Sequence, residues 1–92
     1  MGDYIDLTEK QKEKLIQCFQ CYEPRMTGYV YVPHEQSRGN GYMLFVFKKS
    51  AIFYEADIRR IKEAARKTKT SFTIELYEGD WISVLYFATF QY

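Results

Sequence analysis

Hydrophobic positions recur at helical spacing in two segments of the chain. Leu15, Phe19 and Tyr22 lie on one stripe of residues 9–22, which predicts a helix with one buried face. Thr8 before this segment and Gln11 within it match a capping box, in which each side chain bonds the other residue's backbone amide. Residues 55–68 carry a second stripe, with acidic residues at their start and basic residues at their end, so we predict a helix there too.

Four other segments alternate in the manner of strands. Residues 28–33 and 42–47 flank Asn40-Gly41, a dipeptide typical of the two-residue hairpin turn that needs positive φ at both positions. Residues 72–78 and 81–90 flank Gly79-Asp80 in the same way. Because Pro33 cannot donate to a strand ladder, we expect the first of these strands at an edge of the sheet.

The order of these elements, α-β-β-α-β-β, predicts an α+β fold with two layers. We expect a four-stranded, mainly antiparallel sheet made of two β-hairpins, with two helices on one of its faces. Residues 1–92 have the length of a single domain. The order of the strands in the sheet stays open, since two hairpins can be joined in several ways.

The two predicted turns decide which side chains share a face of the sheet. A two-residue turn at Asn40-Gly41 would place Tyr42 opposite Gly39, and a turn at Gly79-Asp80 would place Trp81 opposite Glu78. One face then collects Phe, Leu and Met, and the other collects tyrosines. Two helices are too few to cover both, so we expect the tyrosine-rich face to meet water.

Such a face favours a binding partner, because tyrosine gives a large contact area at low entropic cost. A homodimer through the sheet is the leading hypothesis. A different partner, a covering loop, or β-propensity alone would explain the same pattern. The predicted dimer face consists of Tyr29, Tyr31, Tyr42, Leu44, Tyr77, Ile82, Val84 and Tyr86.

Charge is distributed unevenly, although the whole chain carries only +1. Residues 48–69 carry +5, whereas residues 1–47 carry −1 and residues 70–92 carry −3. A cationic strip on the second helix could dock a phosphate backbone or an acidic protein, or could simply be solvated. With one arginine from the first hairpin loop, the candidate partner-binding residues are Arg38, Lys48, Lys49, Arg59, Lys62, Arg66 and Lys69.

Cys18 and Cys21 form a C-x-x-C pair near the end of the first helix, where the helix dipole disfavours a thiolate. With His34 they supply three metal ligands, and a structural zinc site needs four. We therefore expect packing cysteines and no metal or other cofactor, with zinc binding and thiol redox chemistry as the alternatives.

The chain carries none of the common hydrolase, metallopeptidase or phosphate-loop motifs, so we expect a non-enzyme. The leading hypothesis is a small protein-binding module, a dimer, that inhibits or regulates a larger partner, as virus- and phage-encoded inhibitors of host or defence machinery do. The alternative is a nucleic-acid-binding protein that uses the basic helix. A carboxylate beside His34, the single histidine, would instead favour catalysis.

The sequence also indicates the cellular compartment in which we expect the protein. The first residues are acidic rather than basic and apolar, and no apolar stretch is long enough to span a membrane. Two cysteines do not make a disulfide framework. We expect an intracellular, reducing environment, the cytoplasm, and no membrane partner.

Overall fold

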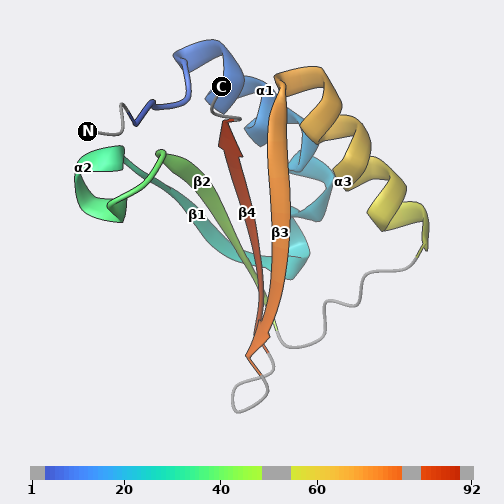
Figure 1. Ribbon diagram of the computed structural model, residues 1–92. Helices are drawn as coiled ribbons and strands as arrows, with labels where there is room; N and C mark the ends of the chain where they lie inside the picture. Colours follow the sequence, from blue (N-terminus) through green and yellow to red (C-terminus); the bar gives the residue numbers. More distant parts are fainter. Residues whose placement is uncertain (1–3, 49–54, 78–81, 90–92) are drawn as a thin grey trace.

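The computed structural model describes residues 4–48, 55–77 and 82–89, and it has the two layers of an α+β fold (Figure 1). The four strands form one antiparallel sheet in the order β1-β2-β4-β3. The elements are α1 (Glu9–Cys18), the 3-10 helix η1 (Gln20–Arg25), β1 (Met26–Val32), α2 (His34–Ser37), β2 (Tyr42–Phe47), α3 (Glu55–Thr68), β3 (Thr70–Tyr77) and β4 (Ile82–Thr89). This confirms the predicted fold class and the position of β1 at an edge.

The helical layer consists of α1, η1 and α3, which lie on one face of the sheet, whereas the short α2 stands apart at the end of β1 (Figure 1). The predicted capping box is present: Gln11 N donates to Thr8 Oγ1 at 3.1 Å, and Thr8 N donates to Gln11 Oε1 at 2.8 Å. The first helix is shorter than predicted and ends at Cys18. Pro24 explains the tighter η1 that follows, since a residue before proline disfavours the α conformation.

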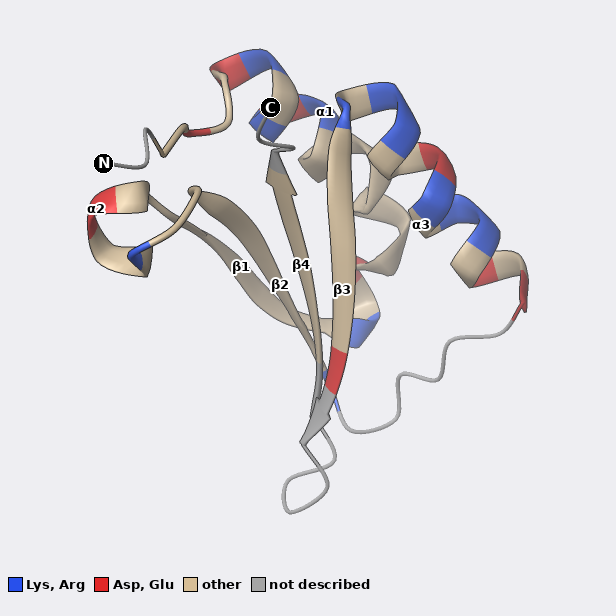
Figure 2. Ribbon diagram, in the orientation of Figure 1, with Lys and Arg blue, Asp and Glu red and all other residues tan. Residues whose placement is uncertain are grey.

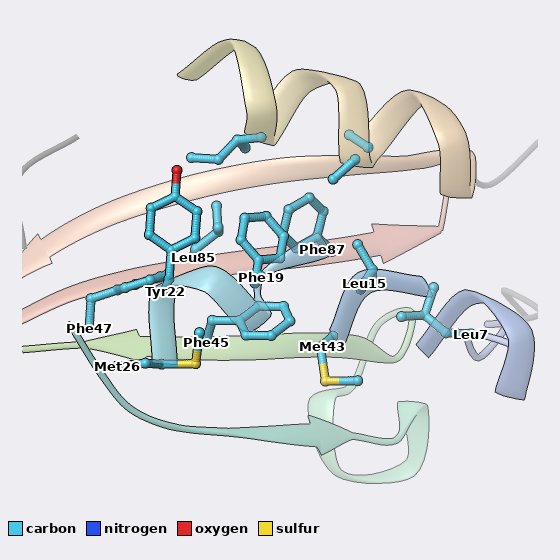
Figure 3. Close-up of a cluster of buried hydrophobic side chains, with 13 residues drawn as sticks. Leu7, Leu15, Phe19, Tyr22, Met26, Met43, Phe45, Phe47, Leu85 and Phe87 are labelled. Carbon is cyan, nitrogen blue, oxygen red and sulfur yellow. The ribbon is translucent and has the colours of Figure 1, made fainter. Parts of the chain in front are cut away.

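The core fills the space between the helices and the sheet, and Phe19 stands at its centre (Figure 3). The Phe19 ring centroid lies 5.0 Å from that of Phe45 and 5.4 Å from that of Phe87. Ile61 of α3 and Leu85 of β4 are fully buried in the same cluster. Among the described residues, no helix is long and apolar enough to cross a membrane.

The register of the second hairpin is as predicted, with Phe72 opposite Phe87 and Ile74 opposite Leu85. Phe87 and Leu85 are buried, and Phe72 and Ile74 pack against the same core. The predicted turn at Gly79-Asp80 lies outside the described residues.

The predicted two-residue turn at Asn40-Gly41 is wrong. Residues 33–41 connect β1 to β2 through α2, and Val32 pairs with Tyr42. Pro33 caps the start of α2, and Arg38 ends it in the left-handed conformation at φ 59°. Asn40 accepts a hydrogen bond from Ile5 N at 3.0 Å rather than forming the hairpin turn.

The longer connection reverses the faces predicted for β1. Tyr29 pairs with Phe45, and Tyr31 pairs with Met43, so both tyrosines lie on the face that carries the core. Their predicted place on the same face as Tyr42 is therefore wrong. A shift by an odd number of residues exchanges the two faces of a strand. Tyr42 pairs with Val32 rather than with Gly39, a shift of seven residues, so the faces of β1 are exchanged.

Candidate interaction surfaces

β1 forms one edge of the sheet, and its register with β2 shifts between Met26 and Gly28. It pairs with β2 on one side, and no described strand pairs with its other side. Its sequence, MTGYVYV, contains neither a charge nor a proline, the residues that usually blunt an edge strand. Tyr29 is 50% exposed and Val30 is 52% exposed, and they point to opposite faces. The edge is therefore apolar on both sides.

The sheet face opposite the helices is also apolar over three of its strands. We call it the open face; it is formed by Val30 and Val32 of β1, Tyr42, Leu44 and Val46 of β2, and Val84, Tyr86 and Ala88 of β4. β3 adds the polar Thr73 and Glu75. A hollow of about 370 Å³ lies between Tyr42 and Tyr86 and these two polar residues, with Ala88 beside them.

The predicted dimer face is only partly retained on this surface. Tyr42, Leu44 and Tyr86 are half-buried members of the open face, with the Tyr42 and Tyr86 rings 5.3 Å apart. Val84 lies there but is 6% exposed, so it offers little surface. Tyr77 and Ile82 pair with each other at the end of the hairpin, and their side chains lie outside the described residues.

Asp6 fastens the N-terminal segment to β1 and α2. Its Oδ1 accepts hydrogen bonds from the Tyr31 hydroxyl at 2.7 Å and from His34 N at 2.9 Å, and its Oδ2 lies 2.6 Å from His34 Nδ1. The Tyr31 hydroxyl in turn accepts from Leu7 N at 2.9 Å. We call Asp6, Tyr31 and His34 the clasp. Local sequence patterns do not reveal it, because these groups are far apart in the chain.

The hydrogen bonds of the clasp shift the pKa values of Asp6 and Tyr31. The donors Tyr31 and His34 lower the pKa of Asp6 to about 2. Burial, followed by the bond to Asp6, raises the pKa of Tyr31 to about 12. A carboxylate does lie beside His34, but its oxygens also hold Tyr31 and a backbone amide. These bonds hold the chain together, and we assign the clasp a structural role.

The cysteines do not form a site with His34. Cys18 packs against the core, and the exposed Cys21 Sγ accepts from Arg60 Nη1 at 3.2 Å. Both thiols are free. Within residues 4–48, 55–77 and 82–89, no three His, Cys, Asp or Glu side chains gather in a way that could hold a metal ion.

Basic residues gather where α1 meets the C-terminal end of α3 (Figure 2). A hollow of about 390 Å³, which we call the lysine hollow, is lined by Lys10, Gln11, Lys14, Lys67, Thr68 and Lys69. A neighbouring one of about 670 Å³, the Phe72 hollow, has Lys62, Arg66, Lys69, Thr70, Ser71 and Phe72 in its lining. Lys69 borders both. The sequence indicated Lys62, Arg66 and Lys69, but not the contribution of Lys10 and Lys14 from the other helix.

The other predicted cationic residues lie elsewhere. Arg59 pairs with Glu55 at 3.5 Å on the exposed side of α3. Arg38 follows α2, at the far side of the sheet from α3 (Figure 1). Lys48 Nζ donates to Pro24 O at 3.2 Å, and Lys49 lies outside the described residues. Arg38 and Lys48 therefore lie away from the cationic residues of α3.

Comparisons with protein-family models, with curated proteins and with solved structures found no significant match to this chain. Two surfaces of the described chain are candidates for a function. The β1 edge with the open face is one, and the pair of basic hollows is the other.

Proposed function

We propose that the protein is a non-enzymatic protein-binding module that works as a homodimer, in which β1 of one copy pairs with β1 of a second copy. The observation that carries this proposal is the uncharged edge strand with Tyr29 and Val30 exposed on its two faces. Backbone amides and carbonyls along such an edge are ready to accept another strand.

A second copy is the occupant that this edge fits best. Two copies of one strand pair antiparallel about a two-fold axis, so each contributes the same surface. No charge on β1 opposes this self-pairing. Tyr29 and Val30 would each meet side chains of the partner strand on their own face of the joined sheet.

Pairing of the edges would also join the two open faces into one wider apolar surface. Val30 and Val32 stand at the border of each open face, so they would lie in the middle of the joined surface. A larger partner that the dimer inhibits or regulates would bind there. A contact between two strands is small, so we expect a weak dimer whose population depends on concentration.

Sedimentation equilibrium over a range of protein concentrations tests this proposal. Val30→Lys places a charge on the edge and should give a monomer at every concentration. Thr73→Lys is the matched control, since it adds the same charge on β3 at the opposite edge of the sheet. A wild-type monomer throughout, or a Val30→Lys dimer, would contradict the proposal.

A further inference from the structure

The lysine hollow brings four cations from two helices to one place. Lys10 and Lys14 stand one turn apart on α1, and Lys67 and Lys69 stand at the end of α3. Gln11 Nε2 donates to Thr68 O at 2.8 Å, which ties the two helices together between these lysines. None of the described residues that line the hollow is acidic.

The described ion pairs of the α1 and α3 carboxylates go to other cations, although Glu63 also attracts Lys67 electrostatically. Glu9 pairs with Lys12 at 3.1 Å, and Glu63 pairs with Arg66. Within the described part of the chain, Lys10, Lys14, Lys67 and Lys69 have no ion pair. Like charges one turn apart on a helix repel each other, so a bound anion would relieve the repulsion.

The helix dipole accounts for only half of this cluster. The C-terminal end of α3 favours cations such as Lys67, as it would on any solvated helix. Lys10 lies in the first turn of α1, where the dipole disfavours a cation. The dipole of α1 therefore does not account for the position of Lys10.

The Phe72 hollow offers a different chemistry beside the lysine hollow. The half-buried Phe72 supplies apolar surface, Lys62 and Arg66 supply cations, and Ser71 supplies a hydroxyl. Lys69, which borders both hollows, is held in the left-handed conformation at φ 55°. A ligand that spans the two hollows needs several negative charges and a flat apolar group.

We infer that the two hollows bind a single-stranded nucleic acid, with phosphates in the lysine hollow and a base against Phe72. A strand carries both groups at close spacing, and unpaired bases stack on aromatic side chains. An acidic peptide would use the cations but would leave the aromatic surface unused. A duplex keeps its bases stacked inside, so it cannot offer one to Phe72.

Fluorescence anisotropy with labelled oligothymidylate of about ten nucleotides tests this inference. Lys10→Glu with Lys14→Glu should weaken binding at least tenfold and should make the slope of log affinity against log salt shallower by about 1.4. Arg38→Glu with Arg59→Glu is the matched control, because it makes the same charge change outside both hollows. Equal binding by the two double variants would overturn the site.

The identity of the ligand is tested separately with the full chain. Phe72→Leu keeps an apolar side chain but removes the ring, so it should weaken binding of the oligothymidylate by about 5-fold or more. The affinity for inorganic polyphosphate should stay unchanged. If a duplex of the same length or polyglutamate binds as tightly as the single strand, the inference is wrong. The Lys10→Glu/Lys14→Glu and Phe72→Leu variants leave the sequence of β1 unchanged. Loss of nucleic-acid binding can therefore be distinguished from loss of the dimer.

Discussion

Val30 lies opposite Leu44 in the register of β1 and β2. This pairing places Val30 on the open face, beyond the reach of the helices, and leaves Tyr29 and Tyr31 on the core side. Tyr31 can then reach Asp6, and its hydroxyl donates a hydrogen bond to Asp6 Oδ1 at 2.7 Å. One register relationship therefore creates both the apolar edge and the clasp.

Gly41 allows the clasp to close. A Cβ atom at this position would collide with the Tyr31 hydroxyl and with Asp6 Oδ1, so Gly41→Ala must displace one of them. We expect a loss of about 1–3 kcal/mol in the free energy of unfolding, measured by urea denaturation. Gly39→Ala is the control, since nothing lies within 4 Å of its Cβ position. Equal stability of the two variants would contradict the close contact.

Asp6 should make the stability of the protein sensitive to acid. Its pKa falls from 3.8 to about 2 on folding, so its stabilising contribution is fully present above about pH 4. The contribution is lost as the pH falls toward 2, because the unfolded state binds the proton first. Asp6→Asn should therefore be less stable than the wild type at pH 7, and the difference should shrink near pH 2. A difference that does not change with pH would argue against the clasp.

Tyr22 and Tyr31 should ionise above the ordinary pKa of tyrosine, which is 10.0. The pKa of Tyr22 is raised to about 12 by burial and by the hydrogen bond that it donates to Asp57, and that of Tyr31 is raised to about 12 as well. Their contribution to stability is present below about pH 10 and is lost as the pH rises through 12. Absorbance titration should show a late step that Tyr22→Phe reduces. A titration in which Tyr22→Phe changes no step above pH 10 would contradict this prediction.

Phe19 should be among the most costly residues to truncate. It is 1% exposed, and its ring contacts aromatic rings of both central strands. Phe19→Ala should cost about 3–5 kcal/mol in chemical denaturation, because it leaves a cavity between α1 and the sheet. Tyr4→Ala removes an aromatic side chain that is 45% exposed and should cost well under 1 kcal/mol. Similar losses in the free energy of unfolding for Phe19→Ala and Tyr4→Ala would show that Phe19 is not at the centre of the core.

The parts of the fold that depend on local sequence were predictable. The capping box at Thr8 and the bounds of α3, Glu55–Thr68, follow from short spacings, and the register of the second hairpin follows from its alternation. The first hairpin was not predictable from Asn40-Gly41, because Pro33 and Arg38 support a helical turn instead. The chain therefore forms the longer connection of residues 33–41 instead of the two-residue turn at Asn40-Gly41.

The candidate sites depend on contacts between distant residues, and this limited their prediction. The lysine hollow needs α1 packed beside α3, which brings Lys10 to Lys67. The clasp needs the true register of Tyr31 and the return of Asp6 to β1. Charge and tyrosine content directed attention to α3 and to the sheet, but only the packing of the elements shows which side chains meet.

Amide hydrogen exchange along β1 tests the central claim most directly. In a monomer, the β1 amides that point away from β2 face no strand of the described chain and should exchange quickly. We predict that their protection rises with protein concentration, in step with the fraction of dimer, and that Val30→Lys abolishes the rise. Fast exchange of these amides at concentrations where the protein is dimeric would show that β1 does not form the interface.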